Sequence, residues 1–221
     1  DSSQLLPLVV GLPNLETVTF SGPGIADEGM EALPKLTRLR RLNLAGSAIT
    51  DETMNAVGQI SGLQVLKLQQ TSITDKGMLH VAGLSQLRAI DLRITNITDT
   101  GLEHLAAIKS LVDIQVERTR VTDAGLAHLK GLTNLQTLIL WSTKITDAGL
   151  VHLKGLTNLQ SLGIGGFRTK ITDSGLVHLK GMTNLQTLRL YETQVTDAGL
   201  VHLTGMTKLE ELNLASTRIT D

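Results

Sequence analysis

The chain has 221 residues and a formal net charge of −1, and it contains no cysteine. The balanced charge argues against a nucleic-acid-binding or membrane-surface protein, and the lack of cysteine excludes disulfides and thiolate metal sites. Only 2% of the residues are aromatic although 41% are hydrophobic, so the core must be built from aliphatic side chains. No apolar run reaches the roughly 18 residues that a membrane-spanning helix needs.

A repeat organises the whole chain. Residues 1–14 are predicted to be the helical half of a partial N-terminal unit, with Leu6, Val9 and Leu12 facing inward. Nine strand-bearing units follow at 24-residue steps, except for one step of 26, and they start at Leu15, Leu39, Leu63, Leu87, Leu111, Leu135, Leu159, Leu185 and Leu209. The last unit is truncated at Asp221, so residues 1–221 form a single array.

Each unit predicts one strand and one helix. In the sixth unit, Leu138 and Leu140 alternate with polar positions, as in a short strand with one buried face. Asp147 is predicted to cap the following helix, whose leucines recur at helical spacing. Because helices need more room than strands, the stack should curve with the sheet inside, as an open horseshoe.

The unit L-x-x-L-x-L-x-x-T-x-I-T-D-x-G-L-x-H-L-x-G-L-x-x resembles that of leucine-rich repeat proteins, and the resemblance covers essentially the whole chain. Near-identical blocks such as residues 146–154 look like tandem arrays from bacterial proteins. The unit is similar to the cysteine-containing subclass, but threonine stands where that subclass has cysteine. The resemblance implies an α/β fold, a right-handed solenoid with a parallel sheet on its concave face and short α-helices on its convex face.

Neither end of the array has the polar capping unit that covers the last layer of a solenoid. This predicts either a fragment of a longer protein or an array whose ends meet a partner, with end-to-end self-association as one form of it.

Two repeated columns are predicted to be structural. One histidine per unit, at 80, 104, 128, 152, 178 and 202, lies on the convex side, where a ring nitrogen can bond a neighbouring loop carbonyl. Threonines at 71, 95, 119, 143, 169, 193 and 217 are predicted to bridge the backbones of successive turns. We find no non-repeating cluster of acid, base and nucleophile, and we predict no enzyme activity, metal site or cofactor.

The positions that vary between units lie on the concave face. Trp141 and Tyr191 flank Gly165, and Ile139 and Arg189 flank Gly163, which predicts a slot between two aromatic walls about 9.6 Å apart, or two strand spacings. The only length irregularity, a loop with Phe167 and Arg168, lies beside this slot.

Charged and polar residues occupy the neighbouring strands of this face. Arg93, Gln115 and Glu117 form a secondary candidate site. The alternative is that these charged side chains pair with one another and not with a partner, so that Lys67 pairs with Asp91 and Arg93 with Glu117 across adjacent strands.

Exposed tryptophan, tyrosine and arginine are enriched at binding hot spots. The sequence therefore predicts a non-catalytic module that recognises a protein or peptide on its concave face, centred on repeats six to eight. The alternative is a structural spacer or assembly element that uses its uncapped ends. No compartment is indicated.

Overall fold

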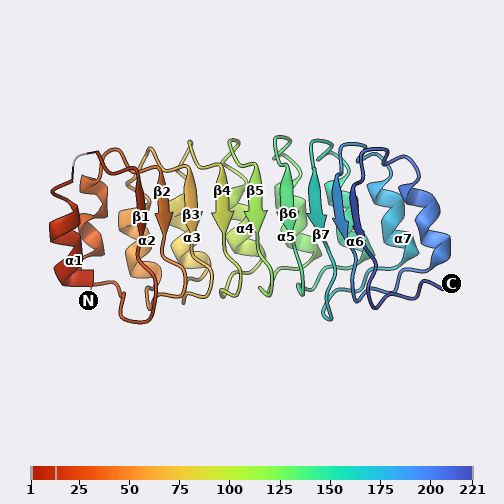
Figure 1. Cartoon of the computed structure of the whole chain (residues 1–221), viewed down its shortest axis with the longest axis horizontal. Coiled ribbons are helices and arrows are strands. Elements are labelled where there is room, and N and C mark those ends of the chain that lie inside the picture. The colour runs from red at the N-terminus through yellow and green to blue at the C-terminus, as the bar shows by residue number, and fades with distance from the viewer. Residues whose placement is uncertain (1, 13, 221) are drawn as a thin grey trace.

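The computed structural model describes residues 2–12 and 14–220. Nine parallel strands form one sheet in chain order, from β1 to β9, and the helices lie behind the sheet along the same long axis (Figure 1). The strands are β1 (Thr17–Thr19), β2 (Arg41–Asn43), β3 (Val65–Lys67), β4 (Ala89–Asp91), β5 (Asp113–Gln115), β6 (Thr137–Ile139), β7 (Ser161–Gly163), β8 (Thr187–Arg189) and β9 (Glu211–Asn213). The predicted α/β leucine-rich repeat solenoid is confirmed, and the sheet face that points away from the helices is called the concave face below.

From Asp51 onward, the helical segments change from α-helix to 3-10 helix along the chain. The α-helices are α1 (Ser2–Val9), α2 (Asp51–Val57), α3 (Asp75–Val81), α4 (Asp99–Leu105), α5 (Asp123–Leu129), α6 (Asp147–Leu150) and α7 (Asp173–Leu176). The 3-10 helices are η1 (Met30–Lys35), η2 (Val151–Leu153), η3 (Val177–Leu179) and η4 (Asp197–Leu203), of which η2 and η3 continue α6 and α7.

The core is a continuous aliphatic stack between the sheet and the helices. The central residue of each strand pairs in register with its counterpart in the next repeat, as Leu138 does with Leu162, and both side chains are fully buried. Phe20 is the buried aromatic residue of this core. Uniform layers explain why the chain needs so few aromatic side chains.

The N-terminal unit follows the prediction only in part. Leu6 is fully buried and Val9 packs against the core, but Leu12 is 53% exposed. Because α1 ends at Val9, the helical register no longer points residue 12 inward.

The assignment of Asp147 as a helix cap was wrong. Thr146 is the N-cap, with extended backbone angles and a hydroxyl that accepts a hydrogen bond from the Ala148 amide at 3.3 Å. Asp147 is the first helical residue, and its carboxylate reaches into the next repeat, where it accepts hydrogen bonds from the Thr172 amide at 2.8 Å and hydroxyl at 2.6 Å.

The same Asp–Thr pairing joins every pair of consecutive repeats from Asp27 to Thr220. Each threonine hydroxyl donates to an aspartate of the preceding repeat, and in the repeats from Thr50 to Thr196 it also accepts from the first turn of its own helix. One hydroxyl thus fixes the start of a helix and its position against the neighbouring repeat. We call this series the Asp–Thr ladder.

The ladder also explains the glycine of the Thr-Asp-x-Gly-Leu segment. A Cβ atom at Gly149 would overlap the Asp123 carboxylate of the preceding repeat, and the equivalent glycines meet the preceding aspartate in the same way. The carboxylate needs the space that only glycine leaves.

The threonine column behaves differently from its prediction. Each hydroxyl donates to the carbonyl three residues earlier in its own repeat, as Thr143 does to Leu140 and Thr193 to Leu190. The column therefore closes the turn after each strand, and the bonds between repeats belong to the Asp–Thr ladder.

The first and last aspartates of the ladder predict a loss of stability in acid. The pKa of Asp27 lies below its ordinary value because hydrogen bonds from Thr50 and Thr53 outweigh the opposing effect of burial, and hydrogen bonds from Thr220 lower the pKa of Asp197. A lowered pKa in the folded state stabilises the fold above the unfolded-state value of about 3.9, and this contribution is lost as the pH falls through the folded-state pKa. We expect urea unfolding midpoints to drop from pH 5 to pH 2.5, and to drop less in Asp27→Asn. An equal drop in both proteins would contradict the role of Asp27.

Candidate functional site

The two aromatic residues of repeats six and eight meet on the concave face. Trp141 follows β6 and Tyr191 follows β8, and their ring centroids are 5.6 Å apart at an interplanar angle of 77°. This edge-to-face contact is much closer than the predicted separation of two strand spacings. The predicted open slot is therefore wrong: the rings lean over β7 and fill it.

The glycines of repeat seven make this contact possible. A Cβ atom at Gly163 would overlap the Trp141 indole, so the indole rests directly on the β7 backbone. A Cβ atom at Gly165 would instead overlap backbone atoms of Tyr191. Ile139, Gly163 and Gly165 are buried, and Ile139 is only 8% exposed. These three predicted binding residues thus form the floor of the site.

Arg189 completes the cluster from β8. Its guanidinium makes two hydrogen bonds with Glu211 of β9, at 2.7 and 2.8 Å, and its Cζ atom lies 5.7 Å from the Trp141 ring centroid. This distance is within the range of a cation–π interaction. Trp141, Tyr191 and Arg189 are together called the aromatic patch.

One atom of the patch has an unmet hydrogen bond. The Trp141 Nε1 is buried and has no acceptor in the described part of the chain. An unpaired buried donor costs free energy, so the observed indole position is maintained by packing and not by a polar contact.

The longer loop of repeat seven stands beside the patch. Gly166 has a φ of 99°, which favours glycine, and Thr169 closes the turn by donating to the Gly166 carbonyl. Phe167 is 69% exposed, and the Arg168 guanidinium lies 5.2 Å from its ring centroid. Both predicted loop residues are therefore available to a partner.

The secondary candidate residues lie on β4 and β5 or directly after them, and the predicted pairs between strands do not form. Arg93 instead makes two hydrogen bonds with Asp91 of its own repeat, at 2.9 and 2.7 Å. Gln115 donates to Asp113 at 3.2 Å, and Glu117 lies 3.8 Å from Arg118. Arg93 with Asp91, and Gln115 with Asp113, pair along one strand because residues two apart project from the same face.

The histidine column does not make the predicted contact. No histidine side chain makes a hydrogen bond in the part of the chain that the structure describes, and the His178 Nδ1 is buried without a partner. Within residues 2–12 and 14–220, no three histidine or acidic side chains converge as metal ligands.

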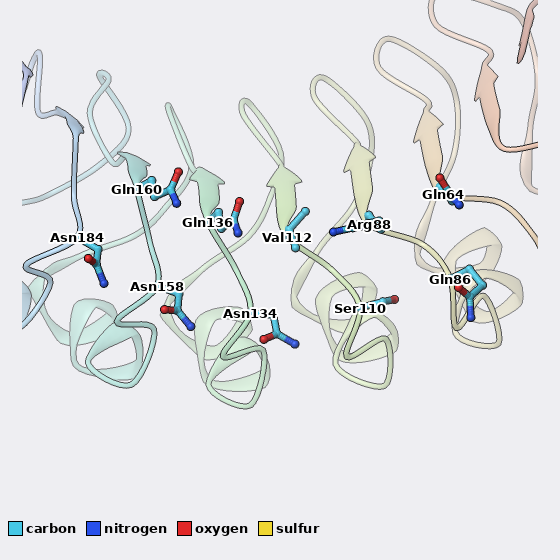
Figure 2. Close-up of a pocket in the computed structure, with 10 residues that line it drawn as sticks. All are labelled: Gln64, Gln86, Arg88, Ser110, Val112, Asn134, Gln136, Asn158, Gln160 and Asn184. Atoms are coloured by element: carbon cyan, nitrogen blue, oxygen red, sulfur yellow. The ribbon is translucent and has the colours of Figure 1, made fainter.

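A concavity that was not predicted is a polar furrow of about 610 Å³ at the edge where the strands begin. Figure 2 shows its two rows of side chains, one at the strand starts and one in the segments that lead to them. The first row is Gln64, Arg88, Val112, Gln136 and Gln160, and the second is Gln86, Ser110, Asn134, Asn158 and Asn184. The repeated Thr-Asn-Leu-Gln segment of repeats six to eight is the signal that was available in the sequence.

Four of the five residues in the second row make contacts between repeats. Asn134, Asn158 and Asn184 each donate to a backbone carbonyl of the preceding repeat, at 2.9 to 3.1 Å. Ser110 donates to the Leu87 carbonyl in the same direction. The furrow also lacks an aromatic side chain, so we prefer the aromatic patch as the candidate site.

Comparisons with known proteins agree with this architecture. A family model described as Leucine Rich repeat matches residues 205–221. Internalin C2 from Listeria monocytogenes has a similar structure, with a TM-score of 0.79 and 24% sequence identity over 96% of this chain and 91% of that chain. The internalin inlF from the same organism has a TM-score of 0.63 and 22% identity over 86% of this chain. The plant peptide hormone receptor RGFR1 in complex with RGF2 has a TM-score of 0.54 and 16% identity over 96% of this chain.

The last two proteins are longer than the matched region: this chain spans 65% of the inlF chain and 41% of the receptor chain. No curated protein sequence matches the chain. Among the described residues, none of the helices has the length and hydropathy to cross a bilayer. The 24-residue repeat, the nine-stranded parallel sheet and these structural likenesses show that the chain has the leucine-rich repeat fold.

Proposed function

We propose that the chain is a non-catalytic recognition module that binds a protein or peptide on its concave face, centred on repeats six to eight. The observation that carries the proposal is the aromatic patch, where Trp141, Tyr191 and Arg189 gather over a glycine floor. These three residue types dominate the energetics of protein interfaces. Phe167, exposed on the neighbouring loop, extends the apolar contact surface.

The related structures support this proposal. One of them is a peptide hormone receptor in complex with RGF2, so the same fold serves peptide recognition there. The other two are internalins, which share the solenoid. Because sites are built on a shared scaffold, the variable concave residues are the place to seek this chain's own specificity.

A displayed peptide library selected on the purified chain tests the proposal. The dissociation constant of a selected peptide is then measured by calorimetry for the wild type, for Trp141→Ala and for Tyr191→Ala. Each substitution is expected to weaken binding roughly 30-fold, since loss of a hot-spot residue costs about 2 kcal/mol.

Lys67→Ala is the matched control, because Lys67 is an exposed residue of the same face on β3, far from the patch. It should change the affinity by less than about 3-fold, within the range of surface substitutions. Equal affinity of the wild type and the Trp141→Ala, Tyr191→Ala double variant would show that the site lies elsewhere.

A second candidate function, assembly through an end of the solenoid, rests on apolar surface in repeat nine. Leu212 is 40% exposed there, and Leu209, Leu214 and Ile219 are only half-buried. Light scattering over a hundredfold range of concentration tests it: a rising mass supports assembly, and a constant monomer mass rejects self-assembly.

A further inference from the structure

Only some of the carboxylates on the concave face have a cationic partner. Asp91 is neutralised by Arg93, and Glu211 is neutralised by Arg189, each through a pair of hydrogen bonds no longer than 2.9 Å. Such bidentate pairs leave little charge for a partner. The carboxylates that remain near the aromatic patch are Asp113 on β5, Glu117 just after β5 and Glu192 just after β8.

These three carboxylates lack comparable partners. Asp113 accepts only from the neutral amide of Gln115, and the Glu192 carboxylate has no ion pair or hydrogen bond among the described residues. Glu117 lies 3.8 Å from Arg118, whose side chain is 60% exposed, and ion pairs of this kind contribute little. Repeats five to eight therefore present uncompensated negative charge on the concave side.

This negative charge reaches the aromatic patch. The pKa of the Tyr191 hydroxyl is raised, first by burial and then by the charges of Glu117 and Glu192, and Arg118 opposes them only in part. Burial and the neighbouring charge of Asp91 likewise raise the pKa of Asp113. Burial is the larger cause of both shifts, and at Asp113 the charges of Arg93 and Lys67 oppose that of Asp91, so the carboxylates contribute only the smaller part.

The rings themselves favour a cation. Arg189 already lies over the Trp141 ring, which shows that the indole accepts a guanidinium in this geometry. The charge of Arg189 is committed to Glu211, so it does not satisfy Glu117 or Glu192. Two aromatic rings at a steep angle beside carboxylates form the kind of arrangement that holds an ammonium or guanidinium group.

We propose that the aromatic patch binds a lysine or arginine side chain of the partner peptide, with Trp141 and Tyr191 contacting the cation and Glu117 and Glu192 supplying the opposite charge. This inference rests on the proposed function and specifies the partner's chemistry at the same site. An acidic partner is disfavoured at the aromatic patch. The cations of the loops that follow β5, β6 and β7 flank the patch without being part of it; they are Arg118, Arg120, Lys144, Arg168 and Lys170.

The experiment uses blocked pentapeptides with lysine, arginine, norleucine or glutamate at the central position between glycines. Trp141 is the one tryptophan of the chain, so its indole N–H gives a single, assignable NMR resonance. The lysine and arginine peptides should shift this resonance saturably, with dissociation constants at least 5-fold below that of the norleucine peptide. Raising the salt concentration should weaken their binding.

The Glu117→Gln, Glu192→Gln double variant should bind the lysine peptide about 5-fold more weakly than the wild type. Glu103→Gln is the matched control, because it removes one carboxylate on α4, on the opposite side of the sheet, and it should leave the binding unchanged.

Equal binding of the norleucine and lysine peptides, or equal binding by the wild type and the double variant, would overturn the proposal. So would a shift produced by the glutamate peptide alone, or by none of the four. Each of these outcomes leaves the proposed function to be decided by the library selection with Trp141→Ala and Tyr191→Ala, so the two failures are distinguishable.

Discussion

Replacing Asp123 by alanine is expected to lower the free energy of unfolding by about 3 kcal/mol. The Asp123 carboxylate accepts hydrogen bonds from the Thr146 amide at 2.8 Å and from the Thr146 hydroxyl at 2.6 Å. Hydrogen bonds to a charged group contribute about 1.5–3 kcal/mol each, and the variant also leaves the N-cap of α6 without its orienting partner. Urea unfolding followed by circular dichroism measures the change.

The neighbouring glycine provides a stricter test of the same contact. Gly149→Ala should also cost about 2–3 kcal/mol, since its Cβ would overlap the Asp123 carboxylate. When Asp123 is alanine the overlap with the carboxylate disappears. The double variant should therefore be at least about 1 kcal/mol more stable than the sum of the single changes predicts.

Gly181→Ala is the control for this cycle. A Cβ atom there meets nothing within 4 Å, so the change should be neutral or should stabilise the fold by up to about 1 kcal/mol. Additive costs of Asp123→Ala and Gly149→Ala would show that the carboxylate and the glycine do not interact.

The second large effect is expected at the floor of the aromatic patch, where two glycines of one repeat should respond differently to alanine. At Gly165 the new Cβ meets backbone atoms of Tyr191, which cannot move without distorting β8, and we expect a loss of about 2–3 kcal/mol. At Gly163 it meets the end of the Trp141 side chain, which can rotate away. Gly163→Ala should therefore cost less stability but move the indole towards water.

Tryptophan fluorescence reads out the second change directly, since Trp141 is the one tryptophan of the chain. Gly163→Ala should shift its emission maximum to longer wavelength, with near-wild-type unfolding in urea. Unchanged emission in Gly163→Ala, or a smaller loss of stability for Gly165→Ala than for Gly163→Ala, would show that the indole does not rest on β7.

The repeat made most of the fold predictable. A leucine pattern with a constant 24-residue step places one strand and one helical segment in each unit, because equal units stack only when their strands and helices align. The variable columns correctly indicated where the aromatic residues would gather, since strand positions two apart share one face. Leu12 was predicted to face inward but is exposed, because the α1 helix ends at Val9.

Contacts between repeats were much harder to foresee. Sequence spacing shows that an aspartate, a threonine and a glycine recur, but it does not show whether the aspartate bonds within its own helix or with the next repeat. The structure decides this, because a carboxylate at the first helical position lies beside the following threonine only when two repeats are stacked. The histidine column, in contrast, still has no polar contact that explains it.

The almost aromatic-free composition is determined by the sequence itself: a stack of identical aliphatic layers needs no large rings, so the few exceptions mark a candidate site. Only the tertiary structure shows how the rings of Trp141 and Tyr191 contact each other. The strand spacing alone predicted an open slot between Trp141 and Tyr191, whereas side chains lean into any space that glycine leaves empty. The stacked repeats therefore produce a filled aromatic patch where a slot was predicted. They pair Arg93 with Asp91 of its own repeat and Arg189 with Glu211 of the next strand, so that negative charge remains beside the patch.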